Sequence, residues 1–350
     1  MNPLWRDLEQ IRSGTGDLWE EMRGQRLFLT GGTGFFGTWL VESFCHINRE
    51  LDLGARLTVL SRDPARFAAK APHLVSDPAA TMLAGDVRSF VFPADQFRYV
   101  IHAASETVAK PGQDEPLEML STILGGTGRT LEFASKCGAR KFLLTSSGAV
   151  YGKQPSDVTH VPETYSGAPD PVDAGSVYAE GKRASELMCA LYQKMAAARG
   201  VEFEAKIARC WAFCGPHLPL DAHFAVGNFI GDVLAGRPIS IAGDGTPRRS
   251  YLYAADLMIW LWTILFRAPA LVPINVGSGN DVSIRELADV VAEVLAPGTE
   301  VRVAKKSVPG AAPARYVPDV KRAEELLGLR ETVELAEQIR RTAEWHRSRG

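Results

Sequence analysis

The stretch Leu27-Phe-Leu-Thr-Gly-Gly-Thr-Gly-Phe-Phe-Gly37 decides the fold of this chain. Its apolar start is typical of a strand buried on both faces, and residues 38–44 are predicted to form a helix. Gly31 and Gly34 would let the backbone turn tightly and approach a pyrophosphate, and Gly37 would let the helix pack against the strand. The helix start would offer N–H groups and a positive dipole end to the phosphates. Because strand, turn and helix follow one another as a dinucleotide fingerprint requires, we prefer this interpretation to a turn without a ligand.

Composition limits the classes of protein to consider. The 350 residues are 46% apolar and 23% charged, which is ordinary for a globular protein of two domains or of one domain with an extra lobe. A net charge of -2 gives no reason to expect a nucleic acid or an acidic membrane surface as partner. No apolar run is long enough to span a bilayer. Charged residues at 6, 7 and 9 occupy the place where a signal peptide needs an apolar core, so we expect no export signal.

The cysteines are odd in number and mostly far apart in sequence: Cys45, Cys137, Cys189, Cys210 and Cys214. No histidine or cysteine cluster completes a metal set. We therefore expect reduced core thiols, no metal and a cytoplasmic protein.

Strands and helices are predicted to alternate through the first half of the chain without hairpin signals. The predicted fold is therefore α/β, a Rossmann-type, doubly wound parallel sheet with a smaller C-terminal lobe. Two short amphipathic helices, broken at 13–16, should lie on the body or on a partner subunit. The expected divisions are an arm at 1–24, a dinucleotide-binding domain at 25–206 and mainly a substrate lobe at 207–350, with a boundary that is discontinuous.

The end of the second predicted strand, residues 56–60, bears on the choice of cofactor. An acidic side chain usually meets the adenine ribose there, whereas this chain has Ser61 and Arg62 followed by Asp63. An arginine there could accept a 2′-phosphate, which favours NADP over NAD, although Asp63 could still serve the ribose. Asp86, after the third strand, could receive the adenine amino group.

The reactive groups are predicted at two places. Ser147 follows a strand at its carboxyl end, where ligands bind in open sheets. Tyr178 and Lys182 lie four residues apart at the start of a predicted helix and so share one face. An ammonium beside a phenol lowers the pKa of the phenol and makes it a usable proton acceptor. For His102 we prefer a structural role to a catalytic one.

The glycine turn, Ser147 and the Tyr178/Lys182 pair resemble the extended short-chain dehydrogenase/reductase family, in its NAD(P)-dependent sugar-nucleotide epimerase/dehydratase branch. Gly215-Pro216, the stretch 243–251 and Asn275-Val-Gly-Ser278 resemble its C-terminal landmarks. The resemblance implies an enzyme on nucleotide-diphosphate sugars, a homodimer formed by packing helices, and the catalytic residues Ser147, Tyr178 and Lys182. The expected cofactor contacts are Gly31, Thr33, Gly34, Phe35, Phe36, Gly37, Ser61, Arg62, Asp86, Val87, Ala103, Ala104, Ser105, Tyr178 and Lys182.

The expected substrate contacts lie mostly in the second half of the chain. Arg249, with Arg248 in a glycine-rich loop, could bind phosphates by bidentate bonds, and Arg315 is a second candidate. An asparagine usual in this branch is replaced by Ala212, so other side chains must supply sugar contacts. The candidates are His223 and Asn228, for which capping of a loop or helix is the alternative role. The expected substrate set is Thr107, Ser147, His223, Asn228, Arg249 and Arg315.

The two residues after Ser147 limit which reactions of this branch the chain could catalyse. Dehydratases of this branch have an Asp-Glu pair there and decarboxylases a glutamate, whereas this chain has Gly148 and Ala149. Neither can act as acid or base. We therefore expect hydride transfer at C4, by an epimerase or a 4-ketoreductase. The alternatives are a 4,6-dehydratase with acid and base recruited from elsewhere, and a non-catalytic dinucleotide-sensing protein.

Overall fold

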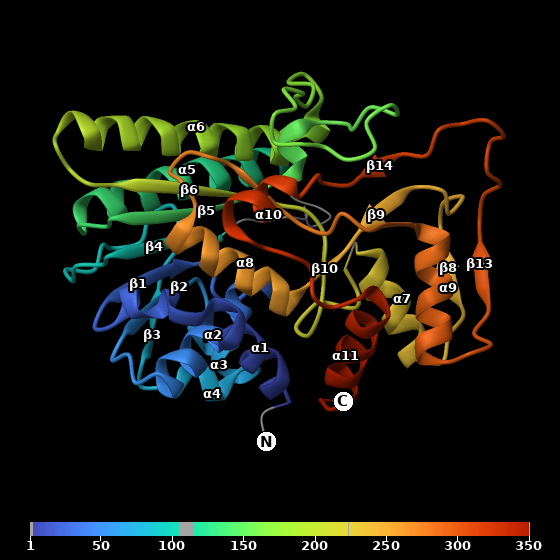
Figure 1. Cartoon of the computed structure of the whole chain (residues 1–350), viewed down its shortest axis with the longest axis horizontal. Coiled ribbons are helices and arrows are strands. Elements are labelled where there is room, and N and C mark those ends of the chain that lie inside the picture. Colours follow the sequence, from blue (N-terminus) through green and yellow to red (C-terminus); the bar gives the residue numbers. More distant parts are fainter. Residues whose placement is uncertain (1–2, 105–114, 223, 350) are drawn as a thin grey trace.

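A seven-stranded parallel sheet forms the body of the computed structural model (Figure 1), which describes residues 3–104, 115–222 and 224–349. The spatial order is β3-β2-β1-β4-β5-β6-β11, with every pair parallel. The strands are β1 Arg26–Thr30, β2 Arg56–Ser61, β3 Ala80–Ala84, β4 Tyr99–His102, β5 Lys141–Ser147, β6 Glu204–Cys210 and β11 Ile274–Val276. Because the order reverses beside β1, a crevice is expected between the carboxyl ends of β1 and β4. The predicted doubly wound sheet is confirmed.

Helices cover both faces of this sheet, and the alternation of strand residues explains why. Leu27 and Leu29 join a core cluster with α2, Phe35–Glu50, and α8, Ala254–Arg267, whereas Phe28 joins the opposite cluster. On that opposite face lie α5, Glu115–Lys136, and α6, Val177–Ala198, side by side (Figure 1). The sheet-edge helices α3, Pro64–Lys70, and α4, Pro72–Val75, complete the first half.

The N-terminal arm lies on the body. Helix α1, Trp5–Thr15, ends inside the break predicted at 13–16, with Gly16 at φ +47°, and is followed by a 3-10 helix, Gly16–Met22. Trp19 is fully buried against Trp262 of α8, with ring centroids 4.7 Å apart. Asp7 accepts hydrogen bonds from Tyr253 and Arg341 at 2.8 and 2.7 Å, which ties the arm to the last helix.

The second half builds a smaller lobe at one end of the sheet (Figure 1). Its helices are α7 Ala225–Leu234, α9 Ile284–Leu295 and α11 Leu335–Arg347, and a capping box of Ser283 and Glu286 starts α9 as expected. The helix α10, Lys321–Leu327, packs instead on β11 and α8 of the body. Its short strands are β7 Phe213–Cys214, β8 Ile239–Ile241, β9 Arg248–Ser250, β10 Leu252–Tyr253, β12 Asp281–Ser283, β13 Val301–Val303 and β14 Arg315–Tyr316. The loop predicted for Arg248 and Arg249 is wrong, because both belong to β9, which is hydrogen-bonded between β12 and β14.

Two features are absent from the described part of the chain. None of the helices they form combines the length and the apolar character needed to cross a membrane. No group of three or more His, Cys, Asp or Glu side chains among them could hold a metal ion.

Candidate active site

The glycine turn after β1 is shaped by close backbone contacts. Gly31 has φ +75°, and a Cβ there would lie 2.5 Å from the backbone of Ala103 and Ala104. A Cβ on Gly37 would lie 2.1 Å from the carbonyl oxygen of Gly31, so this glycine lets α2 start against the strand. At Gly34 a Cβ would meet only that same oxygen at 3.8 Å. Packing within the protein therefore explains Gly31 and Gly37, whereas Gly34 leaves open space at the start of α2.

That open space belongs to a cavity of about 220 Å³ at the carboxyl ends of β1, β2 and β4. It is lined by Gly31, Thr33, Gly34, Leu60, Ser61, Arg62, Gly85, Asp86, Val87, Ala103, Ala104 and Thr122. Most of the predicted cofactor contacts are thus brought together. Leu60, Gly85 and Thr122 were missed, since their apolar or small side chains carry no sequence signal. Phe35 and Phe36 begin α2, and the Phe36 ring packs at 5.0 Å on Phe213.

Two acidic residues near one end of this cavity already have hydrogen-bond partners. Asp63 caps α3 by accepting the backbone N–H of Arg66 at 2.9 Å, so its carboxylate already has a structural partner. Asp86 accepts three hydrogen bonds from Arg88, at 2.8, 2.9 and 3.0 Å. Sequence reasoning missed Arg88, which also binds Glu118 at 2.6 Å. Arg62 is exposed and lines the cavity.

The candidate catalytic residues meet at the end of β5. Ser147 is the last residue of that strand, and its Oγ accepts the backbone N–H of Ala149 at 3.1 Å. Lys182 is buried and donates from Nζ to the carbonyl oxygen of Thr145 at 2.8 Å. The same Nζ lies 5.8 Å from the ring centroid of Tyr178, which is half-buried. The helix α6 thus presents Lys182 to the strand end that carries the serine, with the Tyr178 ring near the lysine.

Burial controls the charge of the groups behind this site. Removal from water lowers the pKa of Lys182 to about 8, so the ammonium is the main form at neutral pH. Burial also lowers the pKa of His102 to about 3. Its Nδ1 lies 2.8 Å from the hydroxyl of Thr30 and its Nε2 3.1 Å from that of Thr127. The imidazole is therefore neutral and hydrogen-bonded inside the protein, which agrees with the structural role expected for it.

Two aromatic residues that sequence reasoning missed crowd the position after Ser147. A Cβ on Gly148 would lie 2.6 Å from two ring carbons of Trp211 and 2.8 Å from the hydroxyl of Tyr316. The rings of Trp211 and Tyr316 pack with centroids 4.4 Å apart. No side chain fits at 148 unless these aromatic groups move. The contact between Trp211 and Tyr316 depends on the pairing of β14 with β9, and no local pattern in the sequence indicates that these two strands pair.

The strand β9 separates the candidate phosphate-binding arginines onto two faces. Arg249 pairs with Tyr316 across the sheet, and its guanidinium lies 5.8 Å from the Tyr316 ring centroid. Arg248 and Arg315 pair on the other face, where both bind the carboxylate of Asp281. Arg249 therefore lies on the same face of β9 and β14 as Tyr316, the residue that crowds Gly148. Arg315 lies on the opposite face, in the ion pair with Asp281.

The other predicted substrate contacts are placed less fully. Asn228 is half-buried in the first turn of α7. Ser105, Thr107 and His223 lie outside the described residues.

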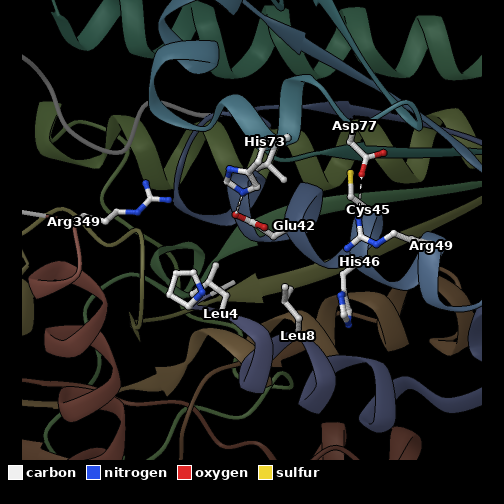
Figure 2. A pocket seen from close by; sticks show the side chains of 11 residues that line it. Leu4, Leu8, Glu42, Cys45, His46, Arg49, His73, Asp77 and Arg349 are labelled. Carbon is white, nitrogen blue, oxygen red and sulfur yellow. Dashed lines mark hydrogen bonds and ion pairs between the residues drawn. The ribbon is translucent and has the colours of Figure 1, made fainter. Parts of the chain in front are cut away.

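A second, larger cavity of about 370 Å³ lies between the arm, α2, α4 and Arg349 (Figure 2). None of the predicted site residues lines it. Several of its charged groups are paired with one another, as in the 2.8 Å contact between His73 Nε2 and Glu42 Oε1 that Figure 2 shows. Size therefore does not identify the reactive site, and the residue chemistry favours the cavity beside the glycine turn.

The chain is similar to known proteins along most of its length. Residues 27–277 match the model of the NAD dependent epimerase/dehydratase family. UDP-glucuronic acid decarboxylase 1 of Arabidopsis thaliana is 31% identical over 327 residues, which are 93% of this chain and 70% of that one. UDP-glucose 4-epimerase of Thermotoga maritima superposes with a TM-score of 0.76 at 22% identity, covering 93% of this chain and 99% of that one. UDP-glucuronic acid 4-epimerase of Bacillus cereus, solved with UDP-glucuronic acid and NAD, gives 0.75 at 20%, covering 93% and 100%. The two structures show a shared fold.

Proposed function

The chain belongs to the NAD-dependent epimerase/dehydratase family, and from that premise we propose that it transfers hydride at C4 of a nucleotide-diphosphate sugar, as an epimerase or a 4-ketoreductase. It is an enzyme of nucleotide-sugar modification. The cavity beside the glycine turn, with the open space at Gly34, fits a dinucleotide. Bound there, the nicotinamide would accept and return the hydride. We assign the cofactor contacts to the predicted residues that line this cavity.

The chain's own residues would supply the proton chemistry. Tyr178 takes the proton of the C4 hydroxyl, and Ser147 hydrogen-bonds the same oxygen and stabilises its developing charge. Lys182 stabilises the phenolate by its charge. Arg249 binds the diphosphate from the second lobe. If the 4-keto sugar rotates and the hydride returns to its other face, the outcome is epimerisation. If external NAD(P)H supplies the hydride to a 4-keto sugar, the outcome is keto-sugar reduction.

The crowding at Gly148 is the single observation that carries this choice. A side chain at 148 would overlap Trp211, and Ala149 offers only a methyl group. The strand end after Ser147 therefore has neither the acid nor the base that elimination of water needs. This supports an epimerase or reductase over the 4,6-dehydratase alternative. The grouping of Ser147 and Lys182 at one strand end supports catalysis over a role in sensing dinucleotides.

Decarboxylation of UDP-glucuronic acid is the second candidate, favoured by curated relatives 28–31% identical to the chain. Oxidation at C4 would make the sugar a β-keto acid, because the carboxyl group is attached to C5. Such an acid loses carbon dioxide with electron flow to the C4 oxygen, so that step requires no base at 148 or 149. The crowding at Gly148 therefore argues against elimination of water more strongly than against decarboxylation.

We also propose NADP as the preferred cofactor. The support is that Arg62 lines the cavity, whereas Asp63, the residue that could serve the NAD ribose, does not line it and caps α3. We retain the domain division at 24/25 as a proposal and place the second one, expected at 206/207, after Cys210, because β6, Glu204–Cys210, is one strand of the central sheet. The proposed boundary between the dinucleotide-binding domain and the substrate lobe is discontinuous, because α8 and β11 come from the second half of the chain and pack in the body.

A homodimer through α5 and α6 is proposed from exposed apolar side chains. Leu187, Leu191 and Met195 follow one another at four-residue spacing on α6, and all three are exposed. Light scattering should give twice the chain mass for the wild type and the monomer mass for Leu191→Arg. All five cysteines are free and buried, which supports a reducing, cytoplasmic setting.

The test is to incubate the enzyme in heavy water with NADP, NAD or their reduced forms and a panel of nucleotide sugars and nucleotide 4-keto sugars, with UDP-glucuronic acid included. An epimerase or reductase gives products without deuterium at C5 or C6 in NMR spectra. Deuterium at C5 or C6 of a 4-keto-6-deoxy product would reject the proposal in favour of a dehydratase. Release of carbon dioxide from UDP-glucuronic acid would instead establish the decarboxylase.

A further inference from the structure

A partly buried ion pair lies directly behind the catalytic strand end. Glu186 of α6 accepts two hydrogen bonds from Arg209 of β6, at 3.0 Å from Nε and 2.7 Å from Nη2. The two side chains are only 12% and 15% exposed. This bidentate geometry fixes both groups in orientation as well as in distance. The pair borders a surface hollow of about 580 Å³ beside Leu187 and is distinct from the cofactor cavity.

The same carboxylate binds the residue that precedes the catalytic serine. Ser146 donates from Oγ to Glu186 at 2.5 Å, and Lys182 donates to the carbonyl oxygen of Thr145 at 2.8 Å. Because side chains alternate along a strand, Ser146 points away from the face that Ser147 presents. Helix α6 thus holds two successive residues of β5, and Ser147 comes next.

The partner arginine continues the network towards the aromatic residues of the site. The Arg209 guanidinium lies 4.8 Å from the ring centroid of Tyr151. Tyr151 donates to Asn275 Oδ1 at 2.9 Å, and Trp211 donates to the same oxygen at 3.2 Å. Glu186 is therefore connected to both sides of the candidate site, the serine strand and the tryptophan over Gly148.

We propose that Glu186 is a positioning residue of the hydride-transfer reaction, which orients the strand end carrying Ser147 and keeps a negative charge one helical turn from Lys182. This inference rests on the proposed function. A purely structural ion pair would stabilise the fold without affecting turnover, whereas a positioning role requires that loss of the charge lower the pKa of Lys182 and that loss of the Ser146 contact lower kcat.

The groups around Lys182 show why this charge matters. The other titratable side chains are Tyr178 and Cys189 on α6, Cys210 on β6 and His102 on β4. Burial raises the pKa of both thiols, to about 12 for Cys210, and lowers the pKa of His102 to about 3. These thiols and the imidazole are neutral at physiological pH, so they add no charge. Glu186 raises the pKa of Lys182 against the larger opposite effect of burial.

The first experiment measures Lys182 in the full chain, without substrate. Glu186→Gln removes the charge and keeps an amide oxygen that can accept from Ser146 and Arg209. NMR titration of the isotope-labelled Lys182 side chain should show a midpoint about half a unit lower in this variant, because Arg209 compensates part of the carboxylate charge. Glu180→Gln, on the same helix and beside the same hollow, should leave the midpoint at its wild-type value.

The second experiment measures turnover on any accepted nucleotide sugar. In Glu186→Gln the alkaline limb of the kcat profile should move to lower pH by the same half unit, about a threefold loss of rate on that limb. Ser146→Ala keeps the charge and removes the contact, so it should lower kcat about tenfold with KM little changed and leave the Lys182 midpoint unaltered.

An unchanged Lys182 midpoint in Glu186→Gln would overturn the proposal, even if that variant were less stable to heat. An unchanged kcat in Ser146→Ala would overturn the role in orienting the strand end. Failure of the wild type on every nucleotide sugar would count against the proposed function instead, since the NMR titration requires no turnover.

Discussion

Gly148 and Trp211 are packed so closely that a Cβ on the glycine would lie 2.6 Å from two carbons of the indole ring. Gly148→Ala should therefore lower the free energy of unfolding by about 1–3 kcal/mol through overpacking. Urea denaturation measures this, and Ala149→Ser at the next residue is the matched control, expected to unfold close to the wild type. Wild-type stability in Gly148→Ala would show that the aromatic residues move aside freely and would remove the argument against a side chain at 148.

Tyr178→Phe should retain the fold and dinucleotide binding and lose about 100- to 10,000-fold in rate, because only the proton-accepting hydroxyl is removed. Ser147→Ala should cost less, and the two losses should not add, since both groups act on one oxygen. Tyr192→Phe, further along α6, is the matched control and should keep full rate. Steady-state kinetics measures all of them, and full activity in Tyr178→Phe would contradict the mechanism.

Arg249→Ala should weaken nucleotide-sugar binding and leave dinucleotide affinity nearly unchanged, because Arg249 lies beside Tyr316 in the second lobe. Loss of a charged hydrogen bond of about 1.5–3 kcal/mol corresponds to roughly 10- to 150-fold in Kd, measured by calorimetry. Arg315→Ala should mainly lower the Tm, because it breaks the ion pair with Asp281. An equal fall in dinucleotide affinity in Arg249→Ala would assign this residue to the cofactor site or to the fold.

Arg62→Ala should weaken NADP more than NAD, because only NADP has a 2′-phosphate for the guanidinium to bind. We expect a difference of about 1.5–3 kcal/mol in binding free energy from fluorescence titration. Arg66→Ala, an exposed arginine of the following helix, controls for a general loss of positive charge. Equal weakening of the two dinucleotides would remove the preference for NADP.

Acid should destabilise the protein partly through His102. The pKa of His102 is about 3 when folded, against an ordinary value of 6.5, so between these values the unfolded chain binds more protons. The free energy of unfolding should therefore fall as the pH falls below 6.5, by about 2 kcal/mol from this group at pH 5. Urea denaturation at pH 7 and pH 5 should show a smaller fall in His102→Gln. The same fall in both proteins would mean that His102 already gains its proton in the folded state.

The sheet and the glycine turn could be predicted because their signals are local. Gly31 and Gly37 are needed by contacts with neighbouring backbone, and the apolar runs of buried parallel strands are visible in a few residues. The small lobe could not be predicted in the same way. Arg248 and Arg249 lie among glycine and proline, which indicated a loop, yet β9 exists because β12 and β14 pair with it from far along the chain.

The candidate site, like the fold, was predicted where its signals are local and missed where they are not. Ser147 and Lys182 follow from a strand end and a helix spacing, and the structure brings them together. Tyr316 and Trp211 were missed because each acquires its role only when the two halves of the chain meet over Gly148. Arg315 was chosen for its charge, whereas the pleat of β14 directs that charge to Asp281.

The attachment of the N-terminal arm to α8 determines the order in which the protein can fold on the ribosome. Trp19 is synthesised early, but the rings that bury it, Trp262 and Phe266, are made far later. Until α8 emerges, the first helix of the arm can pack only on α2, and closing so long a loop is slow. We therefore expect newly made chains to expose Trp19 for most of translation, which would make this segment a target for chaperones that bind nascent chains.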